Sequence, residues 1–324
     1  MTKLATAKTK KIKLALQGGA AFGAFQWGVI DSLLRDGRIE ITAVSGASIG
    51  AMNSVALAQG LDQGSNATAR KSLNKLWNAL SANSVDKDMG VQLKMIFAMA
   101  VSGLKGTIKS SLNQVVDFDA LKQNKNGVPL FISALDVKTQ KARIFTRKDI
   151  SVEAVQASGA VPLLIGSVKV DGREYLDGAL IENPVIESMA DIDGDLLVIQ
   201  TFPSLDAPHN TSHEATNTMM NVGMFKDITQ IQKDNERFDK NPKAARALGI
   251  KKTHTHMINI GEPVKVHNAM NFTTQHLNAL FIKGREVADK WLAQNFDSLG
   301  VESTFVADHK PAKPAKAPRP ARKL

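Results

Sequence analysis

The start of the chain alternates predicted strands and helices, and this order limits the fold more than any other feature. Alternating apolar residues over Lys11–Gln17 predict a strand, and apolar side chains at helical spacing predict a helix over Ala20–Arg35. A second strand, Ile41–Ser45, and a helix of small residues, Ala51–Gln59, follow in the same order. Strands that alternate with helices form parallel sheets covered by helices. We therefore expect an α/β fold with a central, mostly parallel sheet and helices on both faces.

The rest of the chain continues this pattern and ends in polar segments. Further strands are predicted at Pro129–Asp136, Ala142–Thr146 and Leu196–Phe202, and Asp171-Gly172 predicts the turn of a hairpin. Residues after 211 are predicted to be largely helical. We expect the following division: a basic flexible N-terminus at 1–11, a domain at 12–300 with a motif-bearing core at 12–203 and a helical part at 204–300, and a basic tail at 301–324.

Composition removes several classes of chemistry. The chain of 324 residues has no cysteine, which excludes disulfides, thiolate metal sites and a cysteine nucleophile. No apolar run approaches the roughly 20 residues of a membrane-spanning helix, and the basic N-terminus leads into no signal-type apolar stretch. We expect a cytoplasmic protein with no resident metal and no cofactor.

The net charge of +10 comes from the two ends of the chain. Residues 1–13 carry five lysines and residues 310–324 carry six Lys or Arg, with no acidic residue in either segment. Removing these eleven from the 41 basic residues leaves 30 against 31 acidic ones. The Pro/Ala/Lys tail is predicted to be a flexible extension, with peripheral contact to an anionic membrane as the alternative. A nucleic-acid partner is less favoured, because the body of the chain is about neutral.

A G-x-S-x-G pentapeptide, Gly46-Ala47-Ser48-Ile49-Gly50, stands between the second predicted strand and the next helix. In that context the motif is typical of a nucleophile held in a tight, strained turn. The flanking glycines let backbones approach closely, and a helix N-terminus favours developing negative charge at Ser48. The same residues also suit a serine that simply caps the helix, and the segment alone does not separate these two hypotheses.

A glycine-rich loop, Gln17–Gly23, follows the first predicted strand. A dinucleotide-binding loop fits poorly, because Ala20 replaces its middle glycine and no acidic residue ends the second strand. A phosphate P-loop is excluded, because the Gly-Lys-Ser/Thr ending is missing. An oxyanion hole of backbone N–H groups and a simple tight turn remain. This loop and the pentapeptide end neighbouring parallel strands, so we expect them side by side at the carboxyl edge of the sheet.

A serine nucleophile needs a base, and the histidines come late in the chain. In an ordinary α/β-hydrolase the nucleophile turn follows several strands, whereas here only one predicted strand precedes it, which argues against a Ser-Asp-His triad. Asp177 is the carboxylate candidate, although the four Asp-Gly pairs of the chain make a simple turn an alternative. His254 and His256 share one face of a predicted strand, where we expect them at the surface. The histidines are His209, His213, His254, His256, His267, His276 and His309.

Three segments in this order resemble the patatin-like phospholipase family: LALQGGAAFGAFQWGVIDSLL, VSGASIGAMNSV and VDGREYLDGALIENP. The resemblance covers residues 12–203, and weaker similarity extends to the closing segment GREVADKWLAQNF. It implies a three-layer αβα fold. It also implies hydrolysis of acyl esters of phospholipids or neutral lipids by a Ser-Asp dyad, without a catalytic histidine and usually without a metal.

The resemblance implies a role for each candidate residue. Ser48 would attack the ester carbonyl, and Asp177 would accept the proton of its hydroxyl. Backbone N–H groups of Gly18, Gly19 and Ala20 would form the oxyanion hole. Water would then hydrolyse the resulting acyl-enzyme.

Two positions depart from the usual loop of the family. The family usually has a third glycine where this chain has Ala20, and Arg, Lys or His where it has Phe22. A backbone donor is expected to survive the first change only if the φ angle of Ala20 is negative. Loss of the cation would weaken anion stabilisation or rearrange the loop. The alternative function is therefore a lipid-surface binding protein on the same fold, with little or no catalysis.

Overall fold

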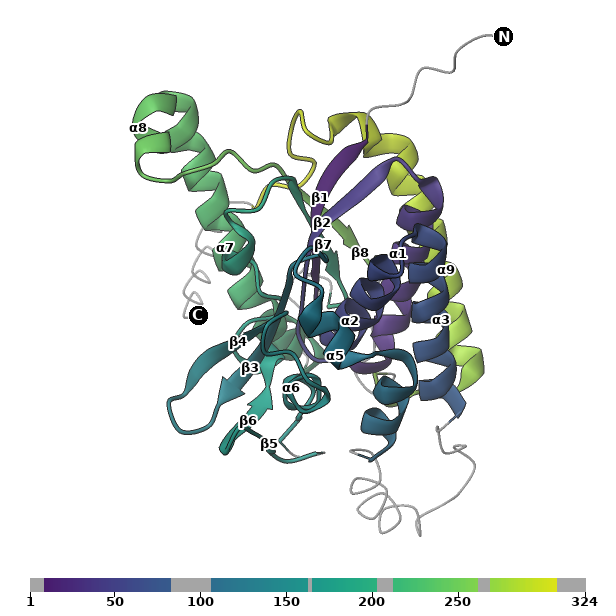
Figure 1. Ribbon diagram of the computed structural model, residues 1–324. Helices are drawn as coiled ribbons and strands as arrows, with labels where there is room; N and C mark the ends of the chain where they lie inside the picture. Colours follow the sequence, from purple (N-terminus) through teal and green to yellow (C-terminus); the bar gives the residue numbers. More distant parts are fainter. Residues whose placement is uncertain (1–8, 83–105, 163–164, 203–211, 262–268, 308–324) are drawn as a thin grey trace, which may run out of the picture.

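The computed structural model describes residues 9–82, 106–162, 165–202, 212–261 and 269–307. These residues form an eight-stranded sheet in the order β5-β6-β3-β2-β1-β7-β8, and β4 also pairs with β3 (Figure 1). The strands are β1 (Lys10–Leu16), β2 (Ile39–Gly46), β3 (Leu130–Asp136), β4 (Lys141–Thr146), β5 (Val168–Val170), β6 (Arg173–Asp177), β7 (Asp195–Gln200) and β8 (Thr255–Asn259). Adjacent strands are parallel from β3 to β8, whereas β4 and β6 are antiparallel to β3. The mostly parallel sheet expected from the sequence is confirmed.

Helices cover both faces of this sheet. Figure 1 shows α1, α2, α3 and α9 on one side and α7 on the other. The helices are α1 (Gly23–Asp36), α2 (Ile49–Asp62), α3 (Asn66–Ala82), α5 (Phe118–Gln123), α6 (Val152–Ser158), α7 (Ser212–Lys240), α8 (Pro242–Ala247) and α9 (Thr274–Asn295), with short 3-10 turns η1 (Ala20–Phe22), η2 (Gly178–Leu180) and η3 (Glu187–Met189). The three-layer arrangement expected from the sequence is therefore present.

The two sides of β1 and β7 contribute to two separate hydrophobic cores. On β1, Leu14 and Leu16 belong to the core under α1 and α2, whereas Ala15 belongs to the core under α7, which also contains Met224 and Ile228. This division follows from the alternation of side chains along a strand. Because central parallel strands are covered on both faces, almost every residue of β1 and β7 is buried.

The largely helical segment 204–300 also contains the strand β8, which extends the sheet beside β7. Two sequence expectations for this part of the chain need correction. His256 on β8 is fully buried rather than at the surface; its Nε2 lies 3.1 Å from the Asp195 carboxylate, and its Nδ1 lies 2.8 Å from the Thr304 hydroxyl. The tail begins later than residue 301, because the Phe305 N–H donates to the Thr255 carbonyl of β8.

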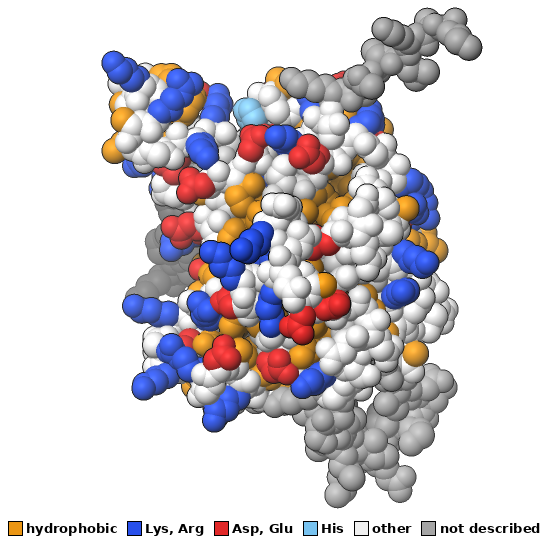
Figure 2. Space-filling view, in the orientation of Figure 1, with side chains coloured by type: hydrophobic (Ala, Val, Ile, Leu, Met, Phe, Trp, Pro, Cys, Tyr) orange, Lys and Arg blue, Asp and Glu red, His pale blue; other side chains and the backbone are white. Residues whose placement is uncertain are grey.

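The face of the molecule seen in Figure 2 fits the neutral body expected from the sequence. Figure 2 shows basic and acidic side chains interspersed over the visible face, with no broad area of a single sign. Within the described ranges, no helix combines the length and the apolar character that crossing a bilayer would require.

Helices α1 and α9 approach closely because glycines stand at their crossing. A Cβ atom at Gly28 of α1 would overlap the backbone of Phe281, and one at Gly284 of α9 would overlap the backbone of Phe25. The contact therefore needs a hydrogen atom at both positions. It brings α9, near the end of the described chain, against the first helix.

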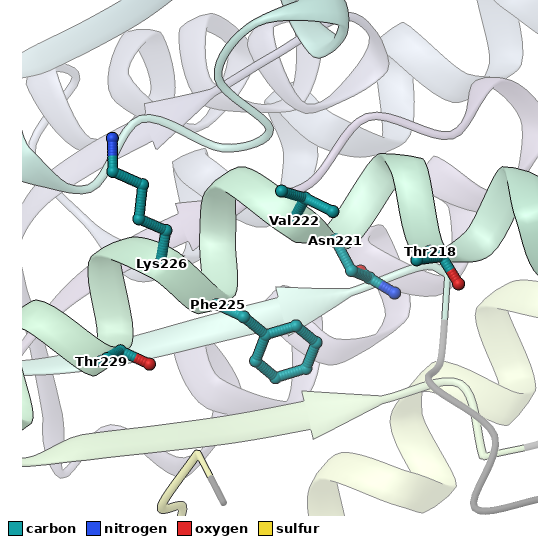
Figure 3. Close-up of a pocket in the computed structure, with 6 residues that line it drawn as sticks. All are labelled: Thr218, Asn221, Val222, Phe225, Lys226 and Thr229. Atoms are coloured by element: carbon teal, nitrogen blue, oxygen red, sulfur yellow. The ribbon is translucent and has the colours of Figure 1, made fainter. Parts of the chain in front are cut away.

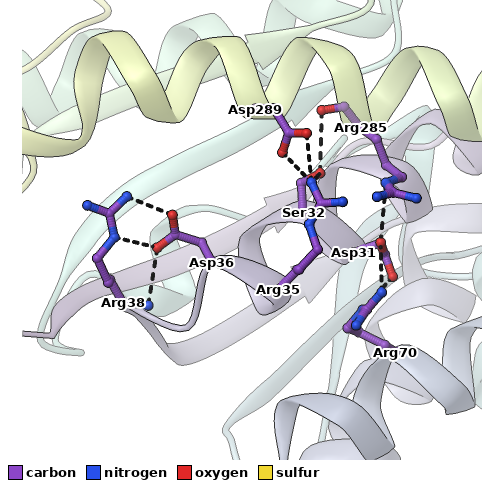
Figure 4. A network of polar contacts seen from close by, with 8 residues as sticks. All are labelled: Asp31, Ser32, Arg35, Asp36, Arg38, Arg70, Arg285 and Asp289. Atoms are coloured by element: carbon purple, nitrogen blue, oxygen red, sulfur yellow. Dashed lines mark hydrogen bonds and ion pairs between the residues drawn. The ribbon is translucent and has the colours of Figure 1, made fainter.

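Ion pairs surround this crossing (Figure 4). The guanidinium of Arg35 lies 2.7 Å from the Asp289 carboxylate and so joins α1 to α9. The buried carboxylate of Asp31 lies 2.6 Å from Arg70 of α3 and 3.5 Å from Arg285 of α9. One acidic side chain of α1 thus pairs with basic side chains from two neighbouring helices.

Replacing Gly28 by Ala is expected to destabilise the fold, because overpacking a close contact typically costs about 1–3 kcal/mol. Gly223→Ala on α7 is the matched control, because its Cβ atom would lie 3.6 Å from the Ile181 carbonyl oxygen, an ordinary contact. Alanine is favoured over glycine inside a helix by about 1 kcal/mol, so the control should be at least as stable as wild type. Denaturant melts of both variants test the crossing, and equal stability of the two would contradict it.

Candidate active site

Ser48 lies in the sharp turn between β2 and α2. Its backbone has φ 56° and ψ −123°, a conformation that residues other than glycine rarely adopt. A Cβ atom at Gly46 would overlap the backbone of Gly50, and one at Gly50 would overlap the carbonyl of Leu16. The two glycines therefore allow the close backbone contacts that hold the turn against the end of β1.

Asp177 lies beside this turn, at the end of β6. The Ser48 hydroxyl donates to Asp177 Oδ2 over 2.9 Å, and the Ala179 N–H donates to Oδ1 over 2.8 Å. Asp177 is 4% exposed, whereas Ser48 is half-buried. Burial raises the pKa of Asp177 to about 7, because a charged carboxylate loses its hydration, and the two hydrogen bonds offset this only in part.

The glycine-rich loop lies against the same turn, as the parallel pairing of β1 with β2 requires. A Cβ atom at Gly18 would lie 3.0 Å from the Cβ of Ser48 and 3.2 Å from that of Ala179. A Cβ atom at Gly19 would lie 2.7 Å from the Thr201 hydroxyl oxygen, so both positions favour glycine. The loop, the serine turn and the segment after Asp177 are thus in mutual contact.

The three expected backbone donors do not have equal surroundings. The Gly18 N–H donates to Asn183 Oδ1 over 2.6 Å, so it is already used inside the protein. Among the residues that the structure describes, the N–H groups of Gly19 and Ala20 have no acceptor, and both residues are half-buried. Of the three expected donors, the Gly18 N–H is therefore occupied, whereas those of Gly19 and Ala20 have no partner among the described residues.

The two unusual loop residues have different surroundings. Ala20 has φ 50° rather than the negative angle that was expected to preserve the donor, and this left-handed conformation costs about 1 kcal/mol or more. Its N–H nevertheless has no acceptor among the described residues, so the positive angle does not by itself remove the donor. Phe22 is fully buried and packs edge-to-face on Phe202, with ring centroids 6.2 Å apart. Phe22 therefore belongs to the core and offers no polar group to the site.

Buried amides, which the sequence motifs did not reveal, position the loop. The Gln17 side-chain oxygen accepts from the N–H groups of Thr201 and Phe202, and its nitrogen donates to Asn221 of α7. These partners lie too far along the chain for any local pattern to indicate them. Asn183, which accepts from the Gly18 N–H, lies six residues after Asp177 in the segment VDGREYLDGALIENP, so only its place in that segment could have indicated it.

A serine hydroxyl completes the turn. The Ser48 N–H donates to the buried Ser158 hydroxyl over 2.9 Å. This bond ties the turn to the end of α6 and leaves the Ser48 hydroxyl hydrogen for Asp177.

His256 lies far from this turn. It is near the start of β7, at the end of the sheet opposite to Ser48.

A shallow hollow runs along α7 (Figure 3). Its volume is about 410 Å³, and Thr218, Asn221, Val222, Phe225, Lys226 and Thr229 line it. In Figure 3 the ring of Phe225 points toward the strands, while Val222 and Lys226 lie on the other side of the helix. Neither Ser48 nor Asp177 is among the lining residues, so this hollow is separate from the serine turn.

Comparisons with solved structures find distant neighbours. VipD from Legionella pneumophila has a TM-score of 0.45 and 18% identity, covering 88% of this chain and 67% of the other. ExoU in the ExoU–SpcU complex of the type III secretion system of Pseudomonas aeruginosa has a TM-score of 0.35 and 15% identity, covering 90% of this chain and 52% of the other.

Sequence comparisons are more informative. Uncharacterized NTE family proteins of Mycobacterium tuberculosis and Mycobacterium bovis are 26% identical to the chain over 221 residues, which is 65% of this chain. The match spans 56% of the length of these relatives. The family model described as patatin-like phospholipase matches residues 14–190, more than half of the chain and the part that holds both loops and Asp177. The chain therefore belongs to the patatin-like phospholipase family.

Proposed function

We propose that the chain hydrolyses carboxylic esters of lipids through Ser48 and Asp177. The observation that carries the proposal is the 2.9 Å hydrogen bond from the Ser48 hydroxyl to the buried Asp177 carboxylate. A hydroxyl is a weak nucleophile until a base within hydrogen-bond distance accepts its proton. Membership of the family supports lipid esters as the substrate class.

The proposed reaction has two steps. Ser48 Oγ attacks the ester carbonyl while its proton passes to Asp177, and the tetrahedral oxyanion receives hydrogen bonds from the N–H groups of Gly19 and Ala20. Asp177 then gives this proton to the ester oxygen as its bond to the carbonyl carbon breaks, so the alcohol leaves and an acyl ester remains on Ser48. In the second step Asp177 accepts a proton from water, the resulting hydroxide attacks the acyl carbonyl, and the released Ser48 alkoxide takes the proton back.

The environment of Asp177 suits this role at neutral pH. A carboxylate with an ordinary pKa is a weak base, whereas a base with a pKa near the working pH is more effective in proton transfer. Burial raises the pKa of Asp177 to about 7. The Ala179 N–H fixes one carboxylate oxygen, so the other is directed at Ser48.

A lipid-surface binding protein with little catalysis is the second candidate. The left-handed angle of Ala20 and the burial of Phe22 favour it, because the loop lacks both the third glycine and the cation that the family usually has. This candidate leaves the Ser48 hydroxyl unreactive, whereas the first requires a reactive serine.

We further propose that the basic C-terminal tail makes peripheral contact with anionic membrane in the cytoplasm. Residues 1–8 and 308–324 lie outside the described residues. Juxtamembrane basic residues contribute about 1 kcal/mol each near an anionic surface. We also keep the domain division expected from the sequence, which places the ester chemistry in a domain at 12–300 and its site within 12–203.

Labelling with a fluorophosphonate probe tests the proposed function. Wild-type protein should form one covalent adduct on Ser48, and Ser48→Ala should form none while it keeps the wild-type circular dichroism spectrum. Hydrolysis of a short-chain ester should be lost in the same variant. Label and turnover that persist in Ser48→Ala would place the chemistry on another residue, and a wild-type protein that is neither labelled nor active would favour the binding candidate.

The dependence of activity on pH should follow the Asp177 carboxylate. Because Asp177 must be ionised to accept a proton and burial raises its pKa to about 7, kcat/KM should fall about tenfold per pH unit below that value. Asp177→Asn should lower the rate by at least ~10²-fold. Rates measured from pH 5 to 9 test this, and a kcat/KM that stays constant from pH 8 down to pH 5 would contradict it.

The same variant has a second, independent readout. The folded-state pKa of Asp177 is raised above the unfolded value, so the folded form binds the proton more tightly, and stability falls as pH rises through this interval. Asp177→Asn removes the cost of burying the charge. Its melting temperature should therefore exceed that of wild type at pH 8, with a smaller difference at pH 5. A variant that melts below wild type at pH 8 would contradict this explanation.

The strained angle of Ser48 predicts a difference between two inactive variants. Ser48→Ala keeps a Cβ atom at φ 56°, and a strained backbone of this kind costs about 1–3 kcal/mol. Ser48→Gly removes that cost, because glycine adopts positive φ angles freely. Both variants lose the hydroxyl, so the difference in their stability reports the backbone strain at position 48. Ser48→Gly should be the more stable of the two in urea titration. Equal or lower stability would mean that the turn stores no strain.

A further inference from the structure

The outer side of α7 carries a line of residues that we call the α7 stripe. Met224 and Ile228 are buried in the core under this helix, so they mark the side that faces the sheet. In Figure 3 Val222 and Lys226 lie on the side away from the strands. Residues at helical spacing continue this outer side for roughly 30 Å, at the helical rise of about 1.5 Å per residue. The stripe consists of Met219, Val222, Lys226, Thr229, Lys233, Arg237 and Lys240, none of which is buried.

The α7 stripe has an apolar end and a basic end. Met219 and Val222 at one end are 73% and 61% exposed. The other members, apart from the half-buried Thr229, are exposed basic residues. The stripe therefore combines exposed apolar surface with positive charge. The acidic residues of α7 between positions 219 and 240 fall on other sides of the helix, and they are Asp227, Asp234, Glu236 and Asp239.

Two lysines supply most of the unbalanced charge of the stripe. Arg237 forms an exposed ion pair with Asp234 over 3.0 Å, and two neighbouring carboxylates partly balance the charge of Lys226. Lys233 and Lys240 form no ion pair within the ranges that the structure describes. Figure 2 shows further Lys and Arg side chains at the projecting end of the molecule that Figure 1 labels α8. The positive charge thus extends past the end of α7.

The apolar end of the stripe lies beside the candidate active site. The side-chain nitrogen of Gln17 donates to the Met220 carbonyl over 3.1 Å and to Asn221 Oδ1 over 2.8 Å. Gln17 begins the glycine-rich loop, so this turn of α7 is joined directly to the loop. Leu180, three residues after Asp177, adds another apolar side chain that is 47% exposed. A surface that binds the apolar end of the stripe would therefore reach the neighbourhood of the dyad.

This distribution fits the surface of an anionic bilayer. Helices that lie flat on such a surface bury apolar side chains at the boundary of the acyl chains and place basic ones at the anionic headgroups. In α7 the two kinds of residue are separated along the helix, so only the end beside the loop would enter the bilayer. A nucleic acid would use the lysines and leave Met219 and Val222 in water.

We propose that α7 binds the surface of an anionic bilayer through the α7 stripe, with Met219 and Val222 at the acyl chains and Lys233 and Lys240 at the lipid phosphates. The choice of a lipid surface rests on the proposed function, whereas the contact itself needs no catalysis. The stripe belongs to a helix of the folded body, so this contact is separate from that of the C-terminal tail. Helix α7 also follows residues 14–190, the part that matches the family model.

A single fluorescent label tests whether the apolar end enters the bilayer. The chain has no cysteine, so Val222→Cys in full-length Ser48→Ala protein can carry one environment-sensitive dye. Vesicles of equal parts phosphatidylcholine and phosphatidylglycerol should shift its emission to shorter wavelength. The same dye on Lys75→Cys of α3, on the other side of the sheet (Figure 1), should keep its emission. A label at position 222 that stays in water while the protein sediments with the vesicles would overturn the inference.

Paired charge variants test the basic end. Lys233→Gln with Lys240→Gln is compared with Lys71→Gln and Lys75→Gln on α3, which remove the same charge from exposed positions elsewhere. Each basic residue at an anionic surface raises binding about fivefold, so the stripe pair should bind these vesicles at least about fivefold more weakly than the α3 pair. Both pairs should keep the wild-type melting temperature, because all four side chains are exposed. Equal binding by the two pairs would overturn the inference.

Two further outcomes separate this inference from its alternatives. A DNA oligonucleotide that binds more tightly than the vesicles, and that the stripe pair no longer binds, would assign the stripe to nucleic acid and overturn the inference. Wild-type protein that docks through the stripe but shows neither fluorophosphonate labelling nor ester turnover would overturn the proposed function alone. The vesicle measurements themselves do not depend on hydrolysis, because the labelled protein and both charge pairs are made with Ser48→Ala.

Discussion

The parallel pairing of β1 with β2 on one side and β7 on the other is the constraint on which the site depends. It places the ends of β1 and β2 at one edge, so the glycine-rich loop and the Ser48 turn meet without any long connection. The register sets Leu16 opposite Gly46, and Gly50 then packs on the carbonyl of Leu16. Side chains in these positions would separate the strand ends. The pairing of the strands therefore sets the positions of the glycine-rich loop and the Ser48 turn relative to each other.

The site also holds two features that are unfavourable for folding. Ser48 has a positive φ angle, and Asp177 is a buried carboxylate without a basic partner among the described residues. Each of these features costs free energy on folding, and such features persist only where the surrounding structure holds them in place. Here the fixing groups are the Ala179 N–H on Asp177 and the Ser158 hydroxyl on Ser48, together with two hydrophobic cores. A rigid fold thus allows a hydroxyl and an unpaired carboxylate to remain 2.9 Å apart.

Local patterns predicted the parts of the fold that depend on neighbours in sequence. The strand-turn-helix around Ser48, the alternation of the first elements and the hairpin turn at Asp171-Gly172 are of this kind, and both turn residues have positive φ angles. The amide contacts of Gln17 and Asn183 could not be predicted, because their partners lie far along the chain. The surface position expected for His256 was wrong for the same reason, since its burial results from the pairing of β8 with β7. Long-range contacts, rather than local propensity, position the candidate donors.

If Ser48 carries the acyl group during ester hydrolysis, trapping that intermediate will show it most directly. Wild-type protein is mixed with a p-nitrophenyl ester, quenched in acid within the first turnover, and digested for mass spectrometry. The peptide containing Ser48 should gain the mass of one acyl group, and the burst of p-nitrophenol should equal the amount of this adduct. Turnover at the same rate with no acyl group on Ser48, or with the group on another residue, would contradict the proposed role of Ser48.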